Sequence, residues 1–196
     1  MTEAGTVRAF LALDPPGEVL NEIAAIQNRM KKLLAGDIRW VNPAGIHLTL
    51  KFLGDITRAD IATVADAVSP VAATYAPLSL EIGTAGFFPD VKRPRILWIG
   101  TDGDVKGLIA LQAAVENALA GCGFPREKRS FRPHLTLARI KSPRGFTGAS
   151  VLMDGSSDYR AGSFVGRSVT LFQSTLTPKG AVYTELAQFP FQEKKP

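Results

Sequence analysis

One four-residue sequence, His-Leu-Thr-Leu, occurs twice in this chain, at residues 47–50 and 134–137. The two copies contain the only two histidines among the 196 residues. With average residue usage, Leu-Thr-Leu follows a given histidine with a probability on the order of one in a thousand, so composition alone does not account for the repeat. The repeat therefore predicts a fold in which one local structure is built twice.

The first copy lies in a segment, residues 46–53, in which apolar and polar residues alternate. If this segment is a β-strand, His47, Thr49 and Lys51 project from one face. The apolar residues project from the opposite face: Ile46, Leu48, Leu50 and Phe52. We expect the apolar face to anchor the strand and the polar face to be open to a ligand.

The same order of predicted elements precedes both motifs. In the first half, a short apolar strand at 6–13 and an amphipathic helix at about 18–34, with Gly36 as its expected C-terminal cap, come before the motif strand. In the second half, a compact strand at 96–99 and a helix from Asp102 or Asp104 to about residue 120 do so. Both halves therefore read as strand, helix and motif strand.

The spacing of these elements is also repeated. Phe10 precedes His47 by 37 residues, and Leu97 precedes His134 by the same number. We infer an α+β fold made of two lobes, roughly 1–90 and 91–196, within a single domain. We expect the lobes to be related by a pseudo-twofold axis, with mainly antiparallel sheet, helices packed outside, and the motif strands facing each other across a central cleft.

Other segments complete the prediction. Thr57 and Asp60 resemble a capping box that starts a second helix. Residues 78–84 alternate as a strand, residues 87–94 form a predicted loop rich in proline and basic residues, and residues 142–162 also have the composition of a loop. Residues 168–175 and 182–189 flank the turn at 177–180 and predict a hairpin.

Composition limits the kind of site that this chain offers. A content of 45% hydrophobic residues suffices for a core without disulfides, and the single cysteine, Cys122, excludes an internal one. Two histidines and one cysteine do not make a closed structural zinc site, so we expect no metal and no cofactor.

No signal sequence or 18-residue apolar run is present, so we expect a cytoplasmic protein without membrane contact, and we expect it to be a monomer. The net charge of +5 modestly favours an anionic partner.

Paired histidines are suited to proton transfer at a phosphodiester. With an ordinary pKa of about 6.5, one histidine takes a proton from water while the other gives one to the leaving oxygen. Attacking and departing oxygens lie roughly in line on opposite sides of phosphorus, so the two rings belong on opposite sides of the bond. The sequence pattern itself leaves open which histidine is the acid.

Hydroxyl groups and positive charges would stabilise the phosphate. Thr49 and Thr136 follow their histidines by two residues and would donate to non-bridging oxygens. Lys51 shares the predicted motif face, and further positive residues surround the second motif: Arg126, Lys128, Arg129, Arg132 and Arg139. At five residues past His134, a regular strand would point Arg139 away, so it reaches the site only if the strand bulges, twists or ends first.

Several of these residues also fit a purely structural role. The threonines are ordinary strand formers, and the basic run at 126–132 is equally consistent with a solvated face. Phe52, Trp40 and Phe131 suit either the core or a surface on which RNA bases stack, and we include Phe52 among the candidate substrate contacts.

The sequence around the motifs resembles a known family. The matching segments are Lys51-Phe52-Leu53-Gly54, Phe131-Arg132-Pro133, Ala138-Arg139, Arg8-Ala9-Phe10-Leu11-Ala12-Leu13, Arg39-Trp40-Val41 and residues 171–183. With the paired His-x-Thr-x motifs, they resemble the two-histidine (2H) phosphoesterase superfamily, specifically the bacterial RNA 2′,3′-cyclic phosphodiesterases of the LigT/ThpR type. The likeness covers nearly the whole chain.

The resemblance implies a bilobal α+β fold and metal-independent hydrolysis of a terminal ribose 2′,3′-cyclic phosphate to a 2′-phosphomonoester. It implies that His47 protonates the leaving 3′ oxygen and that His134 activates water. It also implies that Thr49 and Thr136 bind the phosphate and that Arg139 is a third contact. Reversible joining of RNA through 2′–5′ linkages is an implied side activity.

Three alternatives remain at this point. The chain could act on small cyclic nucleotides or on 2′–5′ oligonucleotides instead of RNA ends. It could be a non-catalytic protein that binds RNA ends, with histidines that only grip phosphate. A structural repeat would instead place the two histidines far apart in the core.

Overall fold

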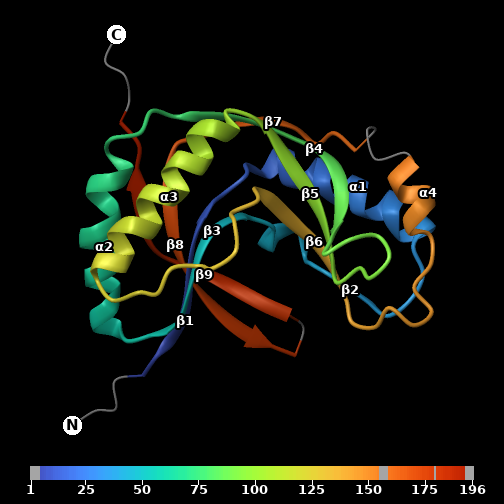
Figure 1. Cartoon of the computed structure of the whole chain (residues 1–196), viewed down its shortest axis with the longest axis horizontal. Coiled ribbons are helices and arrows are strands. Elements are labelled where there is room, and N and C mark those ends of the chain that lie inside the picture. Colours follow the sequence, from blue (N-terminus) through green and yellow to red (C-terminus); the bar gives the residue numbers. More distant parts are fainter. Residues whose placement is uncertain (1–4, 155–158, 179, 193–196) are drawn as a thin grey trace.

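Nine antiparallel strands form one curled sheet in the part of the chain that the computed structural model describes, residues 5–154, 159–178 and 180–192 (Figure 1). The elements in chain order are β1 (Val7–Leu13), α1 (Gly17–Leu33), β2 (Ile38–Trp40), the 3₁₀ turn η1 (Pro43–Gly45), β3 (Leu48–Ile56), α2 (Arg58–Ala72), β4 (Leu78–Phe88), β5 (Ile96–Gly103), α3 (Val105–Gly121), β6 (His134–Ile140), α4 (Ala149–Asp154), β7 (Gly162–Gly166), β8 (Ser168–Thr177) and β9 (Gly180–Pro190).

The two motif strands are neighbours at the middle of the sheet. The strand order is β7-β4-β5-β6-β3-β1-β8-β9, and β2 pairs with β6 outside this path. On either side of β6 and β3 lie β5 and β1, which begin the two repeated units, and beyond these lie β4 and β8. The first half therefore contributes β4 beside β5, and the second half contributes β8 and β9 beside β1, so each half completes the sheet of the other about the β6–β3 contact.

The helices form where apolar residues recur every three or four positions, and they cover one side of the sheet. Helices α2 and α3 pack together at one flank, and α1 packs with α4 at the other (Figure 1). The predicted capping box of α2 is confirmed, because Thr57 and Asp60 exchange side-chain to backbone hydrogen bonds. Asp104, one of the two predicted caps, accepts from the Gly107 N–H at the start of α3.

The hydrophobic core lies between the helices and this side of the sheet. Leu48 on β3 and Leu135 on β6 are fully buried in it. The apolar faces of the helices contribute further buried side chains to this core, such as Ile23 of α1 and Leu111 of α3. None of the helices in the described ranges is long and apolar enough to cross a membrane.

Some predicted boundaries were wrong. Gly36 does not cap α1, because the helix ends at Leu33 and the Leu34 backbone is already extended. Strand β4 continues through Phe88, where a loop was expected, and the expected loop at 142–162 contains α4 and the start of β7. The hairpin is confirmed, although Lys179 of its predicted turn lies outside the described residues.

The equal spacing of 37 residues does not mark equivalent positions. Phe10 on β1 pairs with Phe52, five residues after the first histidine. On β5 it is Ile96, not Leu97, that pairs with Arg139, five residues after the second histidine. The two halves therefore differ by one residue between the first strand and the motif.

Candidate active site

The two motifs meet through one residue pair, Leu48 of β3 opposite Leu135 of β6. In an antiparallel ladder the next positions place His47 opposite Thr136 and Thr49 opposite His134. Directly opposed side chains share a face and have Cβ atoms about 4.5–5.5 Å apart. Because Leu48 and Leu135 point into the helix-covered core, the histidines and threonines all point to the opposite side, here called the open face.

Both imidazole rings are fixed in the same way. Nδ1 of His47 lies 2.9 Å from the carbonyl oxygen of Gly45, and Nδ1 of His134 lies 2.7 Å from that of Arg132. A carbonyl oxygen only accepts, so Nδ1 carries the hydrogen in each neutral ring. Nε2 is therefore the atom of each histidine that is left to take or give a proton.

Aromatic side chains pack against both histidines. The Phe10 ring stacks on His47 with 4.4 Å between centroids, and the Tyr183 ring meets His47 edge-on at 5.1 Å. On the other side, the Phe88 ring meets His134 edge-on at 4.9 Å and lies 5.1 Å from the Trp98 ring. These contacts restrict ring rotation and remove water from one side of each imidazole.

Burial makes both histidines weaker bases than usual. It lowers the pKa of His47 to about 4, against the hydrogen bond to Gly45, and the neighbouring His134 lowers it further. Burial also lowers the pKa of His134, and the positive charge of Arg139 adds to this effect. Both imidazoles of the free protein are therefore neutral at pH 7.

A β-bulge in the first motif strand corrects the predicted positions of Lys51 and Phe52. Ala12 of β1 pairs with Thr49, but Leu11 pairs with Lys51, so Leu50 is an extra residue. After this residue the alternation changes phase. Lys51 was predicted on the motif face, but it points to the helix side, where its ammonium lies 2.8 Å from the Glu116 carboxylate.

The same bulge brings Phe52 to the open face. Its side chain was expected to anchor the strand in the core, yet it is 64% exposed and its ring centroid lies 5.9 Å from that of Phe10. Phe52 thus joins the aromatic side chains around His47. Its role as a substrate contact stays a prediction.

A second bulge, at the equivalent place in β6, determines where Arg139 points. Trp98 of β5 pairs with Thr136, but Leu97 pairs with Ala138, so Leu137 is the extra residue. The side chains of Leu137 and Ala138 are both buried, and Arg139 is exposed on the open face with His134 and Thr136. The condition stated from the sequence, that β6 must bulge for Arg139 to reach the site, is met.

Each bulge is supported by a buried glutamine from a helix of the other half. The Gln27 side-chain amide, on α1, donates to the carbonyl oxygens of Leu137 at 2.9 Å and Val41 at 3.0 Å. The Gln112 amide, on α3, lies 3.4 Å from the Leu50 carbonyl oxygen. The Leu137 carbonyl also accepts from the backbone N–H of Val41 at 2.9 Å, so Gln27 ties the bulged residue of β6 to the segment that follows β2.

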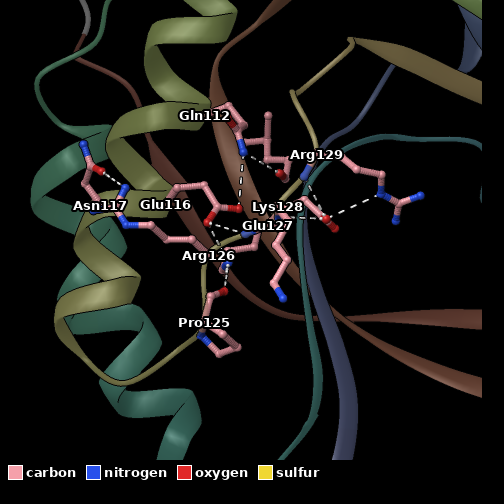
Figure 2. A network of polar contacts seen from close by, with 10 residues as sticks. Gln112, Glu116, Asn117, Pro125, Arg126, Glu127, Lys128 and Arg129 are labelled. Carbon is pink, nitrogen blue, oxygen red and sulfur yellow. Dashed lines mark hydrogen bonds and ion pairs between the residues drawn. The ribbon is translucent and has the colours of Figure 1, made fainter.

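Most of the basic run at 126–132 does not join the histidines. Arg126 and Arg129 line a shallow hollow with residues of α3, and Arg126 bonds Asn117 while Arg129 pairs with Glu127 (Figure 2). The solvated-face interpretation is correct for these two arginines. Arg132 contributes its carbonyl oxygen, which holds His134.

The sequence reasoning missed the aromatic neighbours of the histidines. Phe10 had been used for the repeat spacing and as part of a matching segment, Tyr183 only as part of a matching segment, and Phe88 had been placed in a loop. Alternation within residues 7–13 puts Phe10 on the face opposite Leu11 and Leu13, but it does not place this ring beside His47. Tyr183 is brought to the site by the distant β8–β9 hairpin, and no local pattern indicates this contact.

The chain is similar to known proteins in both sequence and fold. The family model described as LigT like Phosphoesterase matches twice, over residues 13–98 and 99–183. An RNA 2′,3′-cyclic phosphodiesterase of Methanothermobacter thermautotrophicus is 32% identical over 183 residues, which cover 93% of this chain and 98% of that protein. One of Aquifex aeolicus is 35% identical over 187 residues, covering 93% and 96%. The crystal structure of the Thermus thermophilus protein TT0787 has a TM-score of 0.76 at 24% identity, covers 96% of this chain and 100% of that one, and shows the shared fold.

Proposed function

Because this chain belongs to the LigT-like phosphoesterase family, we propose that it hydrolyses the 2′,3′-cyclic phosphate at the end of an RNA chain and leaves a 2′-phosphomonoester. The observation that carries the proposal is the Leu48–Leu135 register, which turns both histidines and both threonines to one face of the sheet. The substrate is RNA-like because a 2′,3′-cyclic phosphate requires a 2′ oxygen.

In the proposed step, Nε2 of His134 accepts a proton from water, and the water oxygen forms a bond to phosphorus. The bond between phosphorus and the 3′ oxygen breaks, and His47 delivers a proton from Nε2 to that oxygen. The shared Nδ1 arrangement supports these roles, since both rings leave Nε2 available. The reaction consumes one water and regenerates the starting protonation states when His134 passes its proton on and His47 regains one.

The low pKa of His47 makes its acid role depend on the substrate. In the free protein, with a pKa of about 4, His47 carries almost no proton at pH 7. A phosphodiester anion held between the rings favours the protonated form and raises the pKa of His47. His47 therefore becomes protonated when the substrate binds.

The surrounding open-face residues complete the proposed site. Thr49 and Thr136 donate to the non-bridging oxygens, and Arg139 offers a charge-assisted hydrogen bond to the same phosphate. The exposed ring of Phe52, beside Phe10, provides a surface for the terminal base. The bulges support this proposal because they turn both Phe52 and Arg139 to the open face.

The test uses an oligoribonucleotide that ends in a 2′,3′-cyclic phosphate, incubated with the purified protein in EDTA. Phosphorus NMR distinguishes the cyclic ester, the 2′-monoester and the 3′-monoester. We expect the 2′-monoester alone. An unchanged cyclic end with tight binding would favour the non-catalytic alternative, and turnover only of 2′–5′-linked oligonucleotides would favour that other substrate class.

A further inference from the structure

Two arginines lie directly opposite each other on neighbouring strands beside the proposed site. In the β2–β6 ladder, Arg39 pairs with Arg139. Residues in this relation have Cβ atoms about 4.5–5.5 Å apart, and like charges so placed repel each other. Both side chains are exposed. The pair is therefore an unfavourable arrangement that an anion between the two guanidinium groups would relieve.

Arg39 and Arg139 both belong to the open face. Their ladder neighbours Trp40 and Ala138 point to the helix side, where Ala138 is buried and Lys31 of α1 lies 5.4 Å from the centroid of the Trp40 ring. Alternation along β2 then turns Arg39 to the opposite side, the side of His134 and Thr136.

The next cross-strand pair on this face, Lys141 and Asp37, consists of opposite charges. Two residues along the same strands, Lys141 and Asp37 form an ion pair with 3.7 Å between nitrogen and oxygen. Within the described residues, no carboxylate oxygen lies within 4 Å of Arg39 or Arg139. The chain thus neutralises one cross-strand pair and leaves the adjacent one, nearer the histidines, with two free positive charges.

We propose that Arg39, together with Arg139, forms a second anion subsite that holds the phosphodiester immediately 5′ of the terminal nucleotide. The inference rests on the proposed function and specifies its substrate as an oligonucleotide chain. In this arrangement Arg139, whose charge acts on His134, would contact both the reacting phosphate and the second one, and Arg39 lies directly opposite it on β2. Planar guanidinium groups suit this task because each offers two parallel donors to one phosphate.

The test compares two substrates of wild-type protein: a mononucleoside 2′,3′-cyclic phosphate and a dinucleotide ending in the same cyclic phosphate. We expect kcat/KM to be at least about tenfold higher for the dinucleotide, consistent with one additional charged hydrogen-bonded contact. Arg39→Gln should reduce this preference to within about twofold, while kcat/KM for the mononucleotide changes less than about twofold. The slope of log kcat/KM for the dinucleotide against log salt should weaken by about 0.7.

A neutral methylphosphonate linkage in the dinucleotide tests the same contact from the substrate side. It should lower kcat/KM of the wild type as much as Arg39→Gln does, and it should have no further effect on Arg39→Gln. Arg58→Gln, the same charge change at the exposed start of α2, is the control and should preserve the preference.

Equal kcat/KM of the wild type for both substrates would overturn the inference and leave the proposed function standing. An equal loss on both substrates in Arg39→Gln would also overturn it, since Arg39 would then act at the reacting phosphate or on the fold. If the wild type hydrolyses neither substrate, the proposed function itself fails.

Discussion

Phe52 and Arg139 occupy the same place in the two halves of the molecule: each lies five residues after its histidine and follows a one-residue β-bulge. Without the bulges, both side chains would point to the helix side, as strict alternation predicts. The repeat has therefore preserved the backbone distortion while the side chain at this position differs. One half offers an aromatic ring and the other a positive charge, which gives a symmetric scaffold an asymmetric site.

Lys51 tests the first bulge, because the reversed alternation buries its ammonium against Glu116. Lys51→Met should destabilise the protein by about 3–5 kcal/mol, since it leaves a buried carboxylate without its cation. The double variant Lys51→Met/Glu116→Leu should recover most of this loss. Arg129→Gln breaks the exposed pair with Glu127 and should cost less than about 1 kcal/mol. Urea unfolding measures all three, and a Lys51→Met variant as stable as wild type would contradict the buried pairing.

Substitution of Gln27 tests the second bulge, because the amide of Gln27 donates to the carbonyl oxygens of Leu137 and Val41. Gln27→Met keeps the length of the side chain but removes this donor from both carbonyls, of which that of Leu137 keeps the Val41 N–H, and it should cost about 1–3 kcal/mol. Because Leu137 is the bulged residue, Arg139 should also lose its position. Arg139→Gln should then reduce kcat/KM less in the Gln27→Met background than in wild type. Additive losses in this double-mutant cycle would show that Gln27 does not position Arg139.

The contribution of His47 to stability should fall with acid, because the folded protein keeps this ring unprotonated at pH values where the unfolded chain protonates it. The pKa of His47 is about 4 when folded and 6.5 ordinarily, so between these values the unfolded chain carries the extra proton. This contribution to the free energy of unfolding should drop by up to about 1.4 kcal/mol per pH unit as the pH falls through this window, and the lowered pKa of His134 acts in the same direction. The raised pKa of Asp14, about 6, acts in the opposite direction, so the effect of His47 is the difference between the slopes of wild type and His47→Gln. Urea unfolding from pH 7 to 4 measures the slope, and His47→Gln should reduce it. An unchanged slope in His47→Gln would contradict the burial of this ring.

A bound phosphate should restore basicity to His47. NMR titration of the ring proton should give a pKa of about 4 in the free protein and a clearly higher value with saturating inorganic phosphate. Thr136→Val should weaken this effect by removing one proposed phosphate donor. If phosphate binds and the pKa of His47 stays the same, the anion does not sit beside this ring and the proposed acid is wrongly assigned.

The sequence predicted the parts of the site that depend on regular alternation and repetition. The pairing of His47 with Thr49 on one face follows from a period of two, and the repeat placed His134 and Thr136 in an equivalent strand. It did not predict the bulges, because an extra residue in one strand is defined only by the strand opposite. For this reason Lys51 was assigned to the wrong face, and Arg139 could be connected to the site only by resemblance.

The aromatic environment of the histidines could not be predicted from the sequence for a related reason. Phe10, Phe88 and Tyr183 come from three strands that are distant in sequence, and the sheet alone brings them to the rings. The strong shift in the pKa of His47 depends on this burial. Sequence periodicity therefore predicted which groups share the candidate site, while long-range packing determines their acidity.

The central claim is that His47 and His134 act together in one step on one phosphate. It is tested most directly by kcat/KM on an RNA end with a 2′,3′-cyclic phosphate, in EDTA, for His47→Ala, His134→Ala and the double variant. Each single variant should lose about 10²–10⁴-fold, and the double variant should lose little more than the worse of the two, because either change disables the shared step. Full activity in either single variant, or losses that multiply in the double variant, would contradict the claim.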